Sequence, residues 1–340
     1  MSAALNSELA QAVFGSTASM QTEGEGCIEH TVTTSDGVRL AVRDYGSDRA
    51  DDPTVVLLHG LCLTQESWEP QVCQLRRRWG SRIRIITYDH RGHGRSTDAP
   101  MPTYRIDRLA ADLAEVLTAL RITDPLTLAG HSMGGMTALA YFSRPASKRP
   151  VEPQGLVLVG TAAGGIAERS IGRLLATPAT AALFELVHHM PHRATDNAIK
   201  AIMRLLGAAL SRYSGNSSAV VEVAAAAIRA TSLTTATGFL PSLKRYNVYH
   251  ALESIAAKTI IVSGGTDMLT PASHSRDMAA AIPDAIHLHH PTAGHMLLQD
   301  ASECVNDAIG RAMRMPRRSG RAAKARTSRS SAAQLALVVS

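Results

Sequence analysis

LTLAGHSMGGMTAL, residues 126–139, joins a short apolar strand to a helix of small residues, with Ser132 at the junction. Glycine weakens strands and helices alike, yet Gly130, Gly134 and Gly135 surround this one hydroxyl. A sharp strand–turn–helix junction strains the backbone of its central residue and leaves room only for very small neighbours, which gives the pattern G-x-S-x-G. The junction also directs the N–H groups of the helix N-terminus toward the serine hydroxyl. The stretch therefore predicts a nucleophilic serine.

The rest of the chain alternates apolar runs with helix-like segments. Five short runs have the length of buried strands: residues 54–60, 82–89, 126–130, 155–160 and 258–265. The first four are separated by helical patterns or short linkers, which is typical of an α/β fold with a mainly parallel central sheet and helices on both faces. Ahead of these runs, residues 28–34 and 38–45 flank a Ser-Asp-Gly turn and predict a β-hairpin.

One helix and one insertion complete this organisation. Residues 104–122 place apolar side chains at helical spacing, which predicts one buried face made of Ile106, Leu109, Leu113, Val116, Leu117 and Leu120. Residues 164–250 are rich in Ala and Leu and lack strand patterns, so we expect a helical cap there, with helices near residues 178–189, 196–210 and 219–230. The expected parts are an N-terminal extension (1–27), a core in two pieces (28–163 and 251–314), the cap (164–250) and a basic disordered tail (315–340).

The formal net charge of +6 is unevenly distributed along the chain. Residues 308–340 contain eight cationic side chains and no acidic one, so the rest of the chain carries a net charge of −2. Such a tail is expected to be disordered and solvated, with at most weak contact with anionic surfaces. No nucleic-acid partner is expected.

Cysteine usage and hydropathy bear on the compartment. Cys27, Cys62, Cys73 and Cys304 are scattered, without the spacing of a metal site or of a disulfide framework. No apolar run reaches the roughly 18 residues that a membrane span needs. No Lys or Arg precedes Arg39, so the charged opening of a secretory signal is missing. A reduced, cytoplasmic protein is expected.

Four further motifs accompany GHSMGG (130–135). They are LLHGLCLTQESW (57–68), YDHRGHGRS (88–96), VSGGTDMLTP (262–271) and PTAGHMLLQD (291–300). Together with the serine motif, they resemble the oxyanion loop, the strand-four signature, the acid loop, the histidine loop and the nucleophile elbow of the α/β-hydrolase superfamily. The resemblance extends over residues 28–314 and implies the α/β-hydrolase fold with a helical lid.

The resemblance also implies a role for each matching residue. Ser132 matches the nucleophile, His295 the general base and Asp267 the acid of a catalytic triad. A serine hydroxyl is a poor nucleophile until an adjacent imidazole takes its proton, and the carboxylate sets the tautomer of that imidazole. The backbone N–H groups of Met133 and Leu61 match an oxyanion hole. Neither a cofactor nor a metal ion is expected.

Other histidines are open to competing interpretations. His287, His289 and His290 crowd the last apolar run, and alternation puts His287 and His289 on one face. No carboxylate or cysteine completes a set at ligand spacing, so a structural role is expected rather than a metal site. For His59 in the oxyanion loop, we expect a hydrogen bond that shapes the loop.

The loop YDHRGHG is expected to be structural as well. Asp89 and His90 are expected to organise it, with Arg91 and His93 pairing nearby. Cys62 lies next to the predicted oxyanion hole and is expected to be a packed thiol.

The identity of the nucleophile limits the reactions that the protein is expected to catalyse. A serine at position 132 disfavours the epoxide hydrolases and dehalogenases of the superfamily, which carry an aspartate there. The triad favours a serine hydrolase that cleaves small-molecule carboxylic esters, either lipid-like or of small acyl groups. The open alternatives are a cofactor-free haloperoxidase or perhydrolase, a thioesterase, a carbon–carbon bond hydrolase, an acyltransferase and a non-catalytic small-molecule receptor.

Overall fold

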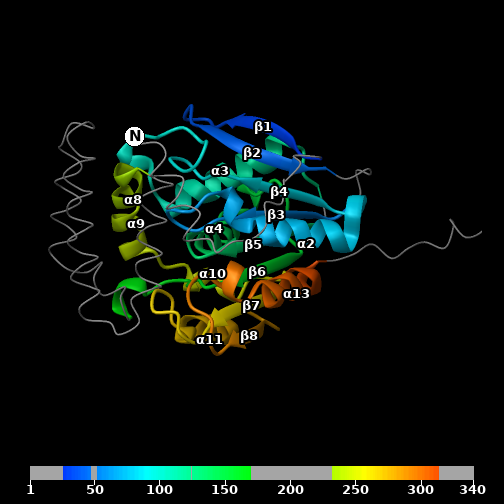
Figure 1. The fold of residues 1–340 in the computed structure, drawn as a ribbon. Helices are drawn as coiled ribbons and strands as arrows, with labels where there is room; N and C mark the ends of the chain where they lie inside the picture. Colours follow the sequence, from blue (N-terminus) through cyan, green and yellow to red (C-terminus); the bar gives the residue numbers. More distant parts are fainter. Residues whose placement is uncertain (1–25, 47–51, 124, 170–231, 314–340) are drawn as a thin grey trace, which may run out of the picture.

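The structure is a computed structural model that describes residues 26–46, 52–123, 125–169 and 232–313. An eight-stranded sheet lies at its centre, with the strand order β1-β2-β4-β3-β5-β6-β7-β8 (Figure 1). The strands are β1 (Ile28–Thr33), β2 (Arg39–Tyr45), β3 (Thr54–Leu58), β4 (Arg84–Tyr88), β5 (Leu126–His131), β6 (Gly155–Val159), β7 (Lys258–Gly264) and β8 (Ile286–His290). β2 runs antiparallel to β1 and β4, whereas the other neighbouring strands are parallel. The predicted α/β class, hairpin and mainly parallel sheet are confirmed.

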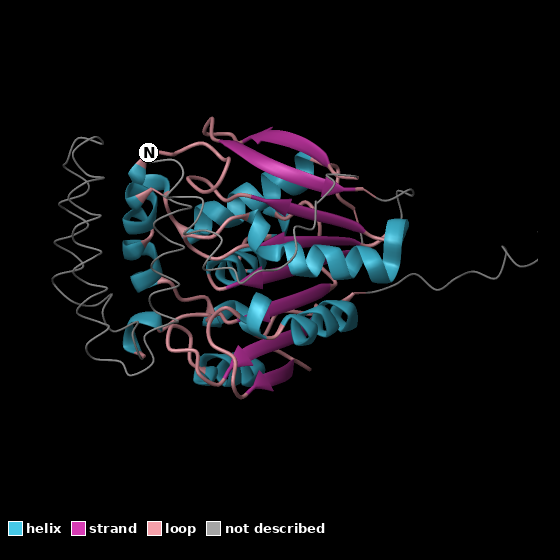
Figure 2. Ribbon diagram, viewed as in Figure 1, coloured by secondary structure: helices cyan, strands magenta, loops and turns pink. Residues whose placement is uncertain are grey.

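Helices cover both faces of this sheet (Figure 2). One face packs against α2 (Glu69–Trp79), α12 (Leu297–Asp300) and α13 (Ser302–Ala312). The other face packs against α3 (Ile106–Ala119), α4 (Met133–Phe142), α10 (Tyr249–Leu252) and α11 (Ala272–Ala281). Two short helices, α8 (Leu233–Gly238) and α9 (Leu240–Arg245), lie at one end of the sheet. The 3-10 turns are η1 (Gln65–Trp68), η2 (Gly80–Arg82), η3 (Met101–Thr103), η4 (Ala146–Lys148) and η5 (Ile166–Glu168).

The alternation of side chains along each strand divides the core into two layers. In β3, Val56 and Leu58 pack under α3 and α4, while Val55 and Leu57 pack under α2 and α13. Because the parallel strands are buried on both faces, they appear in the sequence as unbroken apolar runs. The predicted apolar face of α3 lies in the first layer, with Leu120 packed at its margin.

The parallel strands bring their carboxyl ends to one edge of the sheet. The loops that follow β3, β4, β5, β7 and β8 therefore meet there, although they are far apart in the sequence. These loops carry the five motifs that resemble those of the α/β hydrolases. The fold thus assembles one site from five separate segments.

Part of the expected cap is described. Residues 232–250 form α8, α9 and the start of α10, and Gly164 pairs with Asn247 through an isolated antiparallel bridge. The helices expected near residues 178–189, 196–210 and 219–230 lie outside the described residues, as do residues 1–25 of the expected extension and the tail from residue 314. None of the described helices combines the length and the apolar character that crossing a membrane requires.

Candidate active site

Ser132 stands at a strained turn between β5 and α4. Its φ of 51° and ψ of −117° put a residue with a Cβ into a region that favours glycine. Surrounding hydrogen bonds hold this conformation: the Ser132 N–H donates to the Val159 carbonyl at 2.9 Å, and the Ser132 carbonyl accepts from Thr161 Oγ1 at 2.7 Å. The strain is therefore maintained by the neighbouring strand β6 and the residues that follow it.

The glycines of the motif allow the backbone to approach this closely. A Cβ on Gly130 would overlap the backbone of Gly134, and a Cβ on Gly134 would overlap the carbonyl of Leu58. Gly60 lies against the serine from the other side, where an added Cβ would come within 3.2 Å of Ser132 Cβ. The pattern of small residues thus reflects contact between β3, β5 and α4 at this point.

His295 and Asp267 reach the same place from the loops after β8 and β7. His295 Nε2 lies 3.0 Å from Ser132 Oγ, and His295 Nδ1 lies 2.9 Å from Asp267 Oδ2. A carboxylate accepts, so Nδ1 carries the proton and Nε2 presents its lone pair to the serine hydroxyl. The Asp267 side chain is fully buried and that of His295 is 10% exposed. The three predicted triad residues therefore form one continuous hydrogen-bonded series.

The surroundings of Asp267 favour its charged form. Burial raises the pKa of this carboxyl, but the charge and hydrogen bond of His295 and the hydrogen bonds of Thr270 outweigh it, so the pKa lies below its usual value. Oδ1 accepts from the backbone N–H groups of Leu269 and Thr270, each at 2.9 Å, and Oδ2 accepts from the Thr270 hydroxyl at 2.7 Å. The carboxylate is thus oriented toward His295 before any substrate arrives.

The two expected oxyanion donors come from the residues that follow Ser132 and Gly60. Met133 is the first residue of α4, and the N–H groups of the first helical turn have no partner within the helix. Leu61 follows Gly60, which contacts Ser132, and no acceptor among the described residues takes its N–H. Both amides are therefore available to a ligand oxygen near Ser132 Oγ.

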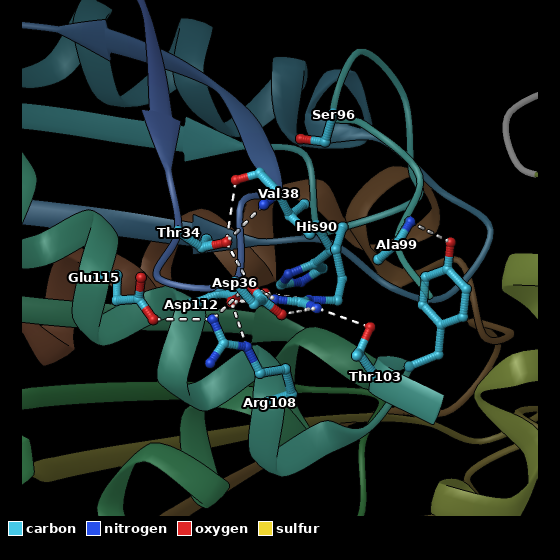
Figure 3. Close-up of polar contacts among 12 residues, drawn as sticks. Thr34, Asp36, Val38, His90, Ser96, Ala99, Thr103, Arg108, Asp112 and Glu115 are labelled. Atoms are coloured by element: carbon cyan, nitrogen blue, oxygen red, sulfur yellow. Dashed lines mark hydrogen bonds and ion pairs between the residues drawn. The ribbon is translucent and has the colours of Figure 1, made fainter. Parts of the chain in front are cut away.

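The loop after β4 is held by a buried ion-pair cluster. The Arg91 guanidinium is fully buried and donates to both carboxylate oxygens of Asp112, each at 2.7 Å, and to Asp36. Arg108 reaches Asp36 and Glu115 in the same cluster (Figure 3). Arg91 thus pairs with acidic residues of the β1–β2 turn and of α3, while its backbone carbonyl accepts from His93 Nδ1 at 3.0 Å.

Two neighbours of the triad were missed at the sequence level. Thr270 orients Asp267, and the spacing Asp-x-x-Thr immediately before Pro271 is a recognisable turn signal. His131 donates through Nε2 to the backbone carbonyl of His295 at 2.8 Å, and its ring lies 5.0 Å from the His295 ring. No local signal predicts this contact, because the residue before the serine is variable in G-x-S-x-G and its partner is far away in the chain.

Two histidines of β8 contact the same serine of the neighbouring strand β7. His287 Nε2 and His289 Nδ1 both contact Ser263 Oγ of β7, at 2.8 Å and 3.0 Å. The described residues contain no group of three or more histidine, cysteine or acidic side chains that is suited to a metal ion. The pair therefore links the edge strand to its neighbour.

The sequence also matches the model of a known protein family. Residues 53–301 fit the family model described as "alpha/beta hydrolase fold". The chain belongs to this family. The match includes all five loops that meet at the carboxyl edge of the sheet, so the resemblance predicted from the motifs is confirmed.

Individual proteins resemble this chain at low sequence identity. The chain is 28% identical over 289 residues to "Putative carbamate hydrolase RutD" of Caulobacter segnis, with 82% of this chain and 97% of that protein covered. It is 26% identical over 259 residues to "sn-1-specific diacylglycerol lipase ABHD11" of Mus musculus, with 76% and 80% covered. Among solved structures, a hydrolase from Pseudomonas aeruginosa PA01 superimposes with a TM-score of 0.62 at 25% identity, with 85% of this chain and 98% of that chain covered.

Proposed function

We propose that this α/β-hydrolase family member is a serine hydrolase that cleaves carboxylic esters through Ser132, His295 and Asp267. One observation carries the proposal: the hydrogen-bonded series Asp267–His295–Ser132, at 2.9 Å and 3.0 Å, ends on a serine at a strained turn. A serine that served only to shape a turn would need neither the imidazole nor the oriented carboxylate.

The first half-reaction forms an acyl-enzyme. Ser132 Oγ attacks the ester carbonyl carbon while His295 Nε2 takes the hydroxyl proton, and Asp267 stabilises the resulting imidazolium through Nδ1. The N–H groups of Met133 and Leu61 receive the negative charge that develops on the carbonyl oxygen. His295 then gives its proton to the departing alkoxide, and the acyl group stays on Ser132.

The second half-reaction regenerates the serine. His295 Nε2 takes a proton from a water molecule, whose oxygen attacks the acyl carbon. The oxyanion again forms beside Met133 and Leu61, and it collapses by breaking the bond to Ser132 Oγ, which takes the proton from His295 Nε2 as the carboxylic acid leaves. The same groups thus serve both steps, with the imidazole alternating between base and acid.

The composition of the expected cap supports an apolar acyl group in the substrate. Residues 164–250 are rich in Ala and Leu, and an apolar cleft is the usual place for such side chains that do not face the core. The name of the mouse relative specifies a diacylglycerol lipase, whose substrate is an ester, and that of the Caulobacter relative specifies a carbamate hydrolase. Hydrolysis of an ester and hydrolysis of a carbamate both proceed by attack at a carbonyl carbon.

A substrate panel tests this proposal. It contains p-nitrophenyl esters of increasing acyl length, a p-nitrophenyl carbamate and acyl-CoA thioesters, with Ser132→Ala as the inactive control. We expect kcat/KM for the esters to rise by up to roughly fourfold for each CH₂ that becomes buried, and then to fall once the pocket is full.

Other results of the substrate panel contradict the proposal or favour a different function. A flat profile, or one that is highest for acetate, contradicts an acyl-binding cleft. Faster turnover of the carbamate or the thioesters moves the assignment to those acyl derivatives. Peracid formation from acetate and hydrogen peroxide without ester hydrolysis favours a perhydrolase, and no turnover of any compound favours the receptor alternative.

A further inference from the structure

The peptide group that carries the Leu61 N–H is held by a neutral histidine. In a trans peptide the carbonyl and the next N–H point in opposite directions, so the Gly60 carbonyl determines where the Leu61 N–H points. His59 Nδ1 lies 2.8 Å from this carbonyl, which can only accept, and His59 Nε2 accepts from the His90 backbone N–H at 2.9 Å. His59 is therefore the neutral Nδ1–H tautomer, in agreement with the expected loop-shaping hydrogen bond.

The following peptide group is held in the same way by a different histidine. The Cys62 N–H donates to His93 Nε2 at 3.2 Å, and His93 Nδ1 donates to the Arg91 carbonyl at 3.0 Å. His93 is thus also a neutral Nδ1–H imidazole. Leu61 therefore lies between two successive peptide groups, each held by a separate buried ring.

The conformation of Cys62 shows why the second ring matters. Its φ is +61°, a left-handed conformation that is unfavourable for a residue with a Cβ. A turn of this kind relaxes unless its surroundings hold it. The hydrogen bond that the Cys62 N–H donates to His93 Nε2 holds the strained residue itself, one peptide beyond the Leu61 N–H.

His93 is in turn anchored on the side opposite the oxyanion loop. Its partner carbonyl belongs to Arg91, whose side chain is fixed between Asp112 and Asp36. The Phe239 ring, between α8 and α9, lies 5.9 Å from the His93 ring. The imidazole is therefore confined by a buried ion pair and by the described end of the expected cap.

We infer that His93 is a positioning residue for the oxyanion hole: it holds the Cys62 peptide so that the Leu61 N–H points at the developing oxyanion. The inference rests on the proposed acyl-transfer function and adds to it a residue from the loop after β4. His93 reaches the reaction only through the Cys62 backbone. Its neutral state is required, because a second ring proton would face the Cys62 N–H instead of accepting from it.

The test compares His93→Leu, which removes the acceptor, with His93→Gln, whose side-chain oxygen can accept from the Cys62 N–H. His90→Leu is the matched control, because it keeps the backbone N–H that donates to His59 and removes only a buried ring, neither nitrogen of which has a hydrogen-bond partner among the described residues. The readouts are kcat and KM for a p-nitrophenyl ester and the inhibition constant of an alkyl trifluoromethyl ketone, which forms an oxyanion on the serine. Melting temperatures verify that each variant is folded.

For His93→Leu we expect kcat to fall by roughly 10- to 100-fold with little change in KM, and the ketone to bind more weakly by a similar factor. His93→Gln is expected to recover most of both losses, and His90→Leu to cause neither. Equal losses in His90→Leu and His93→Leu, or unchanged ketone binding in a folded His93→Leu protein, would overturn the inference.

A measurement on the wild type covers the case in which the variants do not fold. Imidazole ¹⁵N chemical shifts at pH 6 should identify His93 as the neutral Nδ1–H tautomer, and a charged or Nε2–H ring would contradict the inference. The proposed function fails separately: a wild type that neither hydrolyses esters nor binds the ketone removes both proposals. A wild type that does both but is unaffected by His93→Leu removes only the role of His93.

Discussion

The histidines at the carboxyl edge of the sheet lie in two kinds of surroundings. His295 is slightly exposed and has a buried carboxylate 2.9 Å from one ring nitrogen and a serine hydroxyl 3.0 Å from the other. His59 in the oxyanion loop and His90 and His93 in the loop after β4 are fully buried, and their ring nitrogens have only backbone partners or none among the described residues.

The two surroundings differ in whether a ring nitrogen has an acidic partner. Burial lowers the pKa of His59 to about 4 and that of His93 to about 3, and it holds the pKa of His90 well below its usual value. No carboxylate side chain accepts from these rings in the described structure, so gaining a proton would leave a buried charge unpaired. His295, in contrast, has the Asp267 carboxylate 2.9 Å from its Nδ1. A partner carboxylate thus distinguishes the expected base from the rings that shape the loop.

The largest expected effect is the loss of the nucleophile or the base. Ser132→Ala and His295→Ala should each lower kcat for an accepted ester by up to about 10⁶-fold, because neither residue can act without the other. The double variant should be hardly worse than either single one. Steady-state kinetics with a melting temperature for each protein checks this, and additive losses would contradict a shared mechanism.

The next largest effect concerns the carboxylate. Asp267→Asn should lower kcat by about 10⁴-fold without unfolding the protein, because an amide that donates to Nδ1 favours the wrong tautomer of His295. Asp307→Asn, at an exposed position on α13, is the control and should behave as the wild type. If Asp267→Asn stays within tenfold of the wild type, another group supports His295 and the comparison above fails.

Acid should destabilise the fold through the neutral histidines. Their folded-state pKa values lie below the unfolded value of about 6.5, so the unfolded chain takes up protons that the folded chain does not. These histidines therefore make their full contribution to stability above about pH 6.5. As the pH falls toward 4, the free energy of unfolding decreases by about 1.4 kcal/mol per pH unit for each such histidine. Urea unfolding of His93→Gln and wild type between pH 7 and 5 tests this, because the variant should show the smaller slope. Equal slopes would show that His93 is charged in the folded state.

The smallest expected effect is at the sheet edge. Ser263 also has two imidazole nitrogens near its hydroxyl, but it is fully buried, and neither His287 nor His289 has an acidic partner among the described residues. Ser263→Ala should therefore leave kcat within about twofold of the wild type, since it touches no group that takes part in the reaction. A large loss would mean that proximity of serine and histidine is sufficient without a carboxylate.

The sequence predicted much of the architecture because local patterns encode it. Unbroken apolar runs predicted the parallel strands, and the spacing of Ile106, Leu109 and Leu113 predicted the face of α3. Gly130 and Gly134 predicted the turn at Ser132, because close backbone contact excludes larger side chains. Each of these features depends on neighbours in the chain.

Contacts between distant loops were not predictable in the same way. Nothing near His131 indicates that its ring reaches the backbone of His295, and nothing near His93 indicates that it accepts from Cys62. These contacts exist because the parallel sheet brings several loops to one edge. The order of the motifs predicted which loops would meet, but not which side chains would hold which peptide groups.

The most direct test of the central claim is covalent labelling. A fluorophosphonate reacts with a serine that is activated by an oriented imidazole and leaves its phosphonyl group on that oxygen. Mass spectrometry of labelled peptides should find the group on Ser132 of the wild type, with Ser263 unmodified, and no labelling of Ser132→Ala. Labelling that persists in Ser132→Ala, or a folded wild type that does not react at Ser132, would contradict the assignment of the nucleophile.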